Sequence, residues 1–167
     1  MENLQMSIMR KLSILAFSIT IGILTACSTP ATSIKNEKIK AEVLSSLQGF
    51  QSAYNLMDVK EVSDHFNNPT TLIGPGGVSI SIKRDDFNNT FIPVTAYLAN
   101  KDYKHSKWRN IDIKVLDKDL AIASADIIQY DTSNEIIESF GVTFSMSHDG
   151  GDWRISTVST HPPSDLN

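Results

Sequence analysis

The chain has 167 residues, of which 41% are hydrophobic, and its formal net charge is −4. This length corresponds to one domain, with enough apolar residues for a core of its own. No basic cluster interleaved with aromatic residues occurs in the sequence, which argues against nucleic acid as a partner.

The N-terminal region has the pattern of a secretory signal. Arg10 and Lys11 precede an apolar stretch over residues 12–26, and the single cysteine, Cys27, follows it. A charged start, a short apolar core and a small-residue cleavage site are typical of a signal peptide, whereas a membrane span needs about 20 apolar residues. Residues 24–27, Leu-Thr-Ala-Cys, resemble the lipobox of bacterial lipoproteins, in which the cysteine is acylated and the chain is cut just before it.

This resemblance predicts a signal peptide over residues 1–26 and lipid attachment at Cys27, so that the membrane is a partner. Ser28 after the cysteine implies sorting to the outer membrane, facing the periplasm. A lipidated Cys27 forms no disulfide. The polar residues 27–36 are then expected to form a flexible tether, and residues 37–167 the domain. Cleavage leaves 13 basic and 18 acidic side chains, a formal net charge of −5.

Three helices are predicted in the first half of the domain. Apolar residues recur at helical spacing at Ile39, Val43, Leu47, Phe50, Tyr54 and Met57. Asp58, with Glu61 three residues later, is typical of the N-cap of a second, short helix whose apolar face holds Val62 and Phe66. Residues 67–69 are expected to end that helix, and residues 84–99 to form a third one that contains Pro93.

Strands account for the remainder. Two short ones, over residues 70–73 and 78–82, surround a Gly-Pro-Gly-Gly turn, and alternation over residues 111–115 indicates a third. The strand that contains residues 111–115 and three more, over residues 120–130, 136–146 and 153–160, are predicted to form a series of four long strands. This order favours an α+β domain, with helices on one face of a curved sheet whose four long strands are antiparallel.

Two segments resemble a known superfamily. Residues 50–66, FQSAYNLMDVKEVSDHF, look like the first helix pair of the nuclear transport factor 2-like superfamily, which includes SnoaL-type polyketide cyclases and ketosteroid isomerases. The ending GGDWRISTVSTH resembles its closing strand. The resemblance covers residues 37–161 and implies a cone-shaped, cystatin-like fold, in which a curved antiparallel sheet wraps the long N-terminal helix. It also implies a pocket for a hydrophobic small molecule at the wide end of the cone. The outer face of the sheet can pair with a second copy in a homodimer.

The resemblance also allows the catalytic positions of the isomerase branch to be counted along this chain. Its oxyanion-hole tyrosine falls at Phe50, its general-base aspartate near Gly74, and its second oxyanion donor near Val142. Each role needs a side chain that donates or accepts a proton, and none of these residues has one. Isomerase chemistry of that kind is therefore not expected.

Three titratable residues are candidates for chemistry in the pocket. Asp126 lies in the apolar run 121–128, and burial would raise its pKa and suit it to acid–base work; the alternative is an outward-facing aspartate paired with a lysine. His105 and His161 stand at strand ends, where a histidine serves either as a general base, as in dehydratases of this superfamily, or as a surface residue. His65 and His148 are expected to be solvated.

Four aromatic residues are further candidates for lining the pocket: Tyr54, Tyr97, Trp108 and Tyr130. Tyr54 also fits the helix core. No pair of histidines or carboxylates has a metal-ligand spacing, so neither a metal nor another cofactor is predicted.

These observations support three hypotheses. The first is a lipid-anchored envelope protein with a non-enzymatic domain that binds a small molecule or a partner. The second is a dehydratase, cyclase or hydrolase that uses Asp126 and a histidine in a hydrophobic pocket. The third is a purely structural dimer, which would have an apolar outer sheet face and no cavity.

Overall fold

The computed structural model describes residues 31–77 and 79–164, and the residues from Ile34 onward form one compact unit. Cys27, the predicted signal peptide and the first part of the predicted tether lie outside the described residues. Within the described part of the chain, no helix is both long and apolar enough to cross a membrane.

The helices follow the predicted order. The three α-helices are α2 (Ala31–Asn55), α3 (Val59–Asp64) and α4 (Phe87–Ala99), and two short 3₁₀ helices are η1 (Pro75–Gly77) and η2 (Arg84–Asp86). The predicted N-cap of α3 is confirmed, because the Asp58 carboxylate accepts a hydrogen bond from the backbone N–H of Glu61 at 3.0 Å. Helix α2 ends at Asn55, before Met57, which has a positive φ of 55°.

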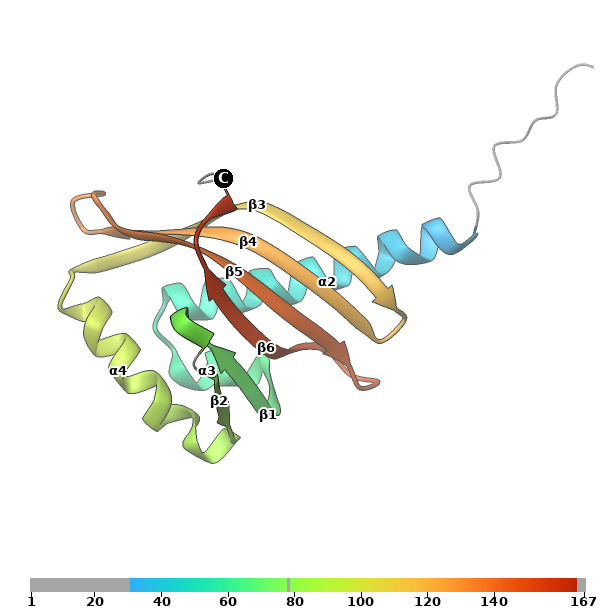
Figure 1. Cartoon of the computed structure of the whole chain (residues 1–167), viewed down its shortest axis with the longest axis horizontal. Helices are drawn as coiled ribbons and strands as arrows, with labels where there is room; N and C mark the ends of the chain where they lie inside the picture. The colour runs from blue at the N-terminus through green and yellow to red at the C-terminus, as the bar shows by residue number, and fades with distance from the viewer. Residues whose placement is uncertain (1–30, 78, 165–167) are drawn as a thin grey trace, which may run out of the picture. The chain divides into compact units, whose positions relative to one another are not determined.

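Six strands form one sheet in the order β2-β1-β6-β5-β4-β3 (Figure 1). Their bounds are β1 (Phe66–Ile73), β2 (Ser79–Ile82), β3 (Tyr103–Asp117), β4 (Leu120–Asp131), β5 (Ile136–His148) and β6 (Trp153–His161). The four long strands β3–β6 are antiparallel to one another, as predicted, and only the pair β1–β6 is parallel. The domain is therefore an α+β fold with a mixed sheet.

Three boundaries differ from the prediction. Residues 31–36 belong to α2 and not to a flexible tether; the exposed start of this helix carries the ion pairs Lys40–Glu37 at 3.0 Å and Lys38–Glu42 at 3.6 Å. Phe66 begins β1 and does not extend α3, and residues 67–69 also lie in that strand. The pairing of β1 is irregular between Phe66 and Thr71, because Pro69 has no N–H to donate. Strand β3 is much longer than residues 111–115.

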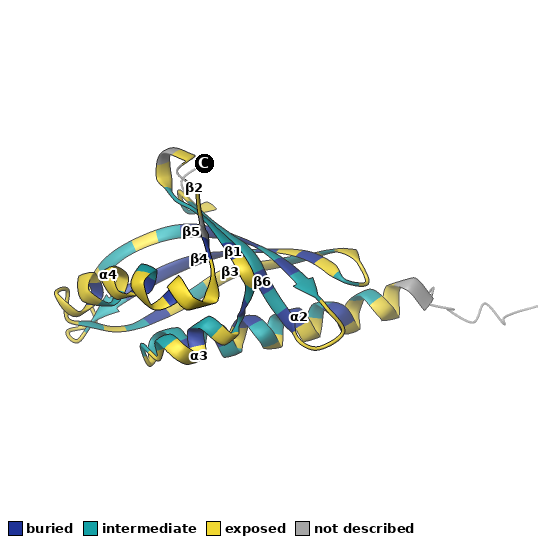
Figure 2. Ribbon diagram, turned by 90° about the horizontal axis from the view of Figure 1, so that it is seen from below, coloured by how far each residue is buried: buried dark blue, intermediate teal, exposed yellow. Residues whose placement is uncertain are grey.

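The core lies between α2 and the sheet (Figure 2). Val43, Leu47 and Phe50 face the sheet from α2 and are almost fully buried, together with Phe144 of β5 and Ile155 of β6. Alternation along the strands decides which side chains join them. On β4, Ala123, Ala125, Ile127 and Gln129 share the inner face, which is the face toward α2, whereas Asp126 points to the outer face.

Candidate functional site

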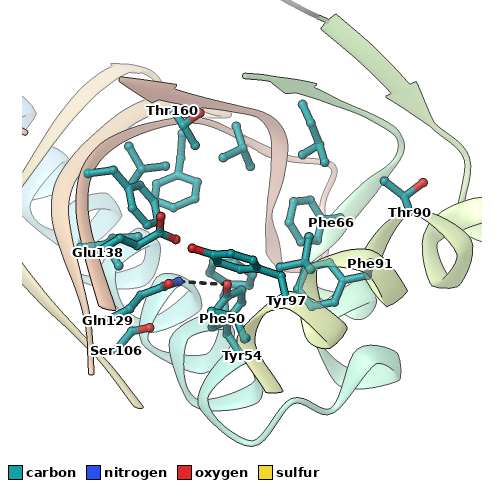
Figure 3. Close-up of a pocket in the computed structure, with 18 of the residues that line it drawn as sticks. Phe50, Tyr54, Phe66, Thr90, Phe91, Tyr97, Ser106, Gln129, Glu138 and Thr160 are labelled. Carbon is teal, nitrogen blue, oxygen red and sulfur yellow. Dashed lines mark hydrogen bonds between the residues drawn. The ribbon is translucent and has the colours of Figure 1, made fainter. Parts of the chain in front are cut away.

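The inner face of the sheet encloses a cavity of about 250 Å³, together with the C-terminal half of α2 and helix α4 (Figure 3). Its lining is almost wholly apolar and is rich in rings: Phe50, Tyr54, Phe66, Phe87, Phe91, Tyr97, Trp108, Phe140 and Phe144. A concave, apolar space with a few convergent polar groups is the usual form of a small-molecule site. The cavity contradicts the hypothesis of a purely structural dimer, which predicted none.

Strand pairing builds the polar part of the cavity. Ser106 of β3 lies opposite Gln129 of β4, and Gln129 lies opposite Glu138 of β5, so the three side chains form one row across the inner face. The neighbouring row is apolar, with Trp108, Ile127 and Phe140 in the corresponding positions. The register of three strands therefore brings together polar residues that are far apart in the sequence.

Ser106 is fully engaged by the protein. Asn55 Oδ1 accepts hydrogen bonds from the Ser106 backbone N–H and from the Tyr103 hydroxyl, both at 2.9 Å, and the hydroxyls of Tyr103 and Ser106 are 2.7 Å apart. Gln51 Nε2 donates to the Ser106 carbonyl at 3.2 Å. These bonds tie the end of α2 to β3 and form one end of the cavity.

Gln129 is only partly engaged. Its side chain is 2% exposed, and its Nε2 donates to the Tyr54 hydroxyl at 3.2 Å (Figure 3). Gln129 Oε1 has no partner, the single such buried side-chain atom among the described residues. Exchanging the two ends of the amide would leave Nε2 unpartnered instead. Because buried polar atoms are nearly always paired in folded proteins, Oε1 is a place in the cavity where a donor from a water or a ligand would be satisfied.

Tyr54 contributes a hydroxyl next to that amide. Burial, with a further contribution from Tyr103, raises the pKa of Tyr54 well above its ordinary value. The side chain is therefore neutral over the physiological range. Since its oxygen already accepts from Gln129, its proton is available to donate.

Glu138 is the one charged residue of the lining. It is half-buried and forms no side-chain hydrogen bond or ion pair with any of the described residues. In Figure 3 its carboxylate and the Tyr97 hydroxyl point toward one another, on the side of the cavity where Gln129 and Tyr54 also lie. The cavity thus has an apolar body and one acidic, hydrogen-bonding end.

The sequence-based site candidates divide between the two sheet faces. Tyr54, Tyr97 and Trp108 line the cavity. Asp126, His105, Tyr130 and His161 do not, because each has the strand parity of the outer face. Their proposed place in the pocket was therefore wrong.

Asp126 is buried, but under the C-terminal segment and not in the cavity. It accepts hydrogen bonds from Asn110 Nδ2 at 2.7 Å, from the Ser164 backbone N–H at 2.9 Å and from the Ser164 hydroxyl. These donors, first the Ser164 hydroxyl and then its N–H, lower the pKa of Asp126 to about 2. The expected raised pKa is thus corrected: hydrogen bonds to the charged form outweigh desolvation.

The histidines are likewise outside the cavity. The His105 ring stacks on Tyr130, with centroids 5.2 Å apart, and His161 Nε2 lies 3.1 Å from the Thr143 hydroxyl oxygen. His65 is half-buried against Phe50, contrary to the expectation of a solvated residue, and burial lowers its pKa. His148 is also partly buried, with its ring beside Trp153. Among the described residues, no group of three metal-ligating side chains occurs.

Two of the isomerase positions do lie at the cavity. Phe50 and Val142 both line it, and neither carries a polar group, so this cavity lacks those donors. Gly74 lies instead in a neighbouring cleft, which shares Glu138, Phe140 and Thr160 with the cavity.

Gln129 and Glu138 were missed by the sequence analysis, although strand alternation contains the signal. Glu138 has the parity of Phe140, Val142 and Phe144, and so falls on the same apolar face. Gln129 is harder to find from the sequence, because the odd-numbered and the even-numbered residues of β4 are both mostly apolar, so alternation does not show which set faces the core.

The comparisons with known proteins agree with this fold. A family model described as NTF2-like protein (DUF6841) matches residues 41–163. No protein with a curated description matches the chain. An NTF2-like protein with a cystatin-like fold from Novosphingobium aromaticivorans is 11% identical, with a TM-score of 0.65 over 87% of this chain and 94% of that one.

Two further solved structures are similar. A putative scytalone dehydratase from Novosphingobium aromaticivorans is 10% identical, with a TM-score of 0.63, and covers 81% of this chain and 99% of its own. A ketosteroid isomerase-like protein from Erwinia carotovora atroseptica is 14% identical, with a TM-score of 0.57, and the match covers 72% of this chain and 92% of that one. At such identities these likenesses concern the fold alone. The chain belongs to the nuclear transport factor 2-like family, whose model spans residues 41–163.

Proposed function

We propose that this chain is a lipid-anchored protein of the bacterial envelope whose domain binds a small hydrophobic molecule. The observation that supports binding is the 250 Å³ cavity, with its ring-rich lining and the unpartnered Gln129 Oε1. A cavity of about 150 Å³ holds a benzene ring, so this one has room for a substituted ring or a compound of similar size.

The residues that the enzyme hypothesis assigned to catalysis do not line the cavity. The hypothesis required Asp126 and a histidine in the pocket, and neither Asp126 nor any histidine lines the cavity; His161 borders the neighbouring cleft. Similarity to a putative scytalone dehydratase concerns the fold. Binding without catalysis is the interpretation that the described residues support best.

The membrane partner is proposed from the lipobox, with Cys27 as the anchor. Several acyl chains on one protein hold it stably at a membrane, whereas one chain binds only marginally. A homodimer through the sheet also stays a prediction; Leu120 and Ile122, on the outer face, are 42% and 36% exposed.

Ligand binding is tested by filling the cavity. Val94 lines it from α4 and is 37% exposed, so a larger side chain there narrows the cavity without disturbing the core. Val94→Trp is compared with Ile92→Trp, which adds the same ring on the solvent side of α4, where Ile92 is 56% exposed. The probes are three benzyl compounds of equal size: isobutylbenzene, benzyldimethylamine and phenylacetate.

Saturation-transfer NMR on the Cys27→Ser full chain, which carries no lipid, measures binding. We expect at least one probe to bind the Cys27→Ser and Ile92→Trp forms and to bind Val94→Trp at least tenfold more weakly. If none binds, or if Val94→Trp binds like Ile92→Trp, the cavity is not the site. Mass spectrometry of compounds extracted from natively purified protein would then identify the physiological ligand.

The anchor is tested by cell fractionation. Cys27→Ser is expected to release the protein from the membrane pellet or to leave its leader uncut, while Ser28→Ala leaves both unchanged. Equal pelleting and equal mass of the wild-type and Cys27→Ser chains would contradict the lipoprotein proposal.

A further inference from the structure

The cavity carries charge of one sign only. Glu138 is its single charged residue, and no lysine, arginine or histidine lines it. No described residue pairs with the Glu138 carboxylate. Without a counter-charge, a half-buried carboxylate loses favourable hydration when a ligand excludes water from the space beside it. A ligand that enters this space either supplies that counter-charge or removes more water from an unpaired carboxylate.

The rings add to the same preference. Phe50, Tyr54 and Trp108 meet edge to face or tilted, with centroids 5.9 to 6.0 Å apart, and Phe91 packs edge-on to Tyr54 at 5.7 Å. The face of an aromatic ring carries negative partial charge and attracts cations, most strongly where water is excluded. Ring faces that remain open to the cavity therefore favour a cation over an anion.

Gln129 adds a preference for a polar group over a hydrocarbon at the same end of the cavity. In the structure its Nε2 is used by Tyr54, and its unpartnered atom is the acceptor Oε1. An N–H group on the ligand would satisfy it, whereas a hydrocarbon would not. Gln129 and Glu138 are directly opposite on β4 and β5, and both side chains lie on the same side of the cavity (Figure 3).

We propose that the ligand of this cavity is a small hydrophobic amine, bound in its protonated form. Its ammonium group lies at the Glu138 end, where it pairs with the carboxylate and donates to Gln129 Oε1, and its apolar part fills the ring-lined body. This inference rests on the proposed function, since it names the chemical class of a molecule that the cavity is proposed to bind.

The three benzyl probes test it, because they differ in charge and hardly in shape. At pH 7 benzyldimethylamine is a cation with one N–H, isobutylbenzene is neutral and phenylacetate is an anion. We expect the amine to bind about tenfold or more tightly than isobutylbenzene, and phenylacetate to bind most weakly. Glu138→Gln is expected to remove most of the advantage of the amine and to improve phenylacetate.

The matched control is Glu135→Gln, which removes the same charge three residues away, at an exposed position that does not line the cavity. It should leave the order of the three affinities unchanged. Glu138→Asp keeps the charge and should keep the order as well. Thermal unfolding of each variant establishes that it is folded.

The outcomes separate the two proposals. If isobutylbenzene or phenylacetate binds as tightly as the amine, and Val94→Trp still blocks binding, the cavity binds ligands but the amine class is wrong. If Glu138→Gln and Glu135→Gln weaken amine binding equally, the preference comes from the general acidity of the surface, and the assigned site is wrong. If no probe binds, the proposed function itself fails.

Discussion

Gln129 shows how a single residue links ligand binding to stability. Its amide is buried, donates one hydrogen bond to Tyr54 and leaves Oε1 without a partner in the described structure. An unsatisfied buried acceptor costs about 1–3 kcal/mol, which exceeds the net value of the one bond that the amide forms. The residue therefore contributes more to stability when a donor reaches Oε1.

Replacement of Gln129 by methionine, which has a similar shape, removes this orphan acceptor but also takes away the hydrogen-bond partner of the buried Tyr54 hydroxyl. We therefore expect Gln129→Met in a Tyr54→Phe background, where no hydroxyl loses its partner, to raise the free energy of unfolding by about 1 kcal/mol relative to Tyr54→Phe alone, measured by urea denaturation. The control is Gln51→Met, because Gln51 Nε2 donates to the Ser106 carbonyl at 3.2 Å. That variant should lower the free energy of unfolding. A loss of stability in Gln129→Met as large as in Gln51→Met would show that the amide is fully satisfied.

At the scale of elements, a side chain fixes the start of α3, and the register of the strands decides which side chains share a face. Asp58 caps α3, a helix of six residues whose one buried side chain is Val62. So short a helix gains little from its own hydrogen bonds and depends on its cap and its packing. Its position matters for the site, because α3 connects α2, which carries Phe50 and Tyr54, to β1, which carries Phe66.

Loss of the cap should be measurable. Asp58→Ala is expected to lower the free energy of unfolding by about 1 kcal/mol, because the backbone N–H of Glu61 loses its acceptor. Asp86→Ala is the matched control: Asp86 occupies the N-cap position of α4, but its side chain makes no capping bond. Its substitution should change the unfolding free energy by less than about 0.5 kcal/mol. Equal effects of the two substitutions would contradict the role given to the Asp58 carboxylate.

For the whole domain, Asp126 joins parts of the chain that are distant in sequence. It holds Ser164, close to the C-terminal end, against the outer face of β4, and Asn110 of β3 completes the site. Its three hydrogen bonds favour the ionised carboxylate and keep its pKa at about 2 in the folded protein. In the unfolded chain the pKa returns to its ordinary value near 4.

This difference predicts a dependence of stability on pH. A carboxyl group whose pKa is lower in the folded state stabilises the fold above its unfolded pKa, and that contribution is lost as the pH falls from about 4 to about 2. We expect Asp126→Asn to melt below the wild type at pH 6, and the difference in melting temperature to narrow toward pH 2. Asp112→Asn, at an exposed position of β3, is the control and should show no such narrowing. A constant difference for Asp126→Asn over this range would contradict the assignment.

The amino-acid sequence by itself determined the class and the order of the elements. The helical spacing from Ile39, the cap at Asp58 and the alternation through Phe140, Val142 and Phe144 depend on residues close to one another, and local rules suffice for such patterns. The same patterns supported the α+β fold and the resemblance to the nuclear transport factor 2-like superfamily, which the family model and the solved structures confirm. The signal peptide over residues 1–26 and the lipid anchor at Cys27 remain predictions.

Only the tertiary structure decided which polar residues face the cavity. Asp126 and Gln129 lie three residues apart in one apolar run, and a shift of one position moves a side chain to the opposite face of a strand. Register across β3, β4 and β5 places Gln129 between Ser106 and Glu138 on the inner face, and leaves Asp126 outside beneath Ser164. That choice depends on contacts between residues far apart in the chain, which no local pattern contains.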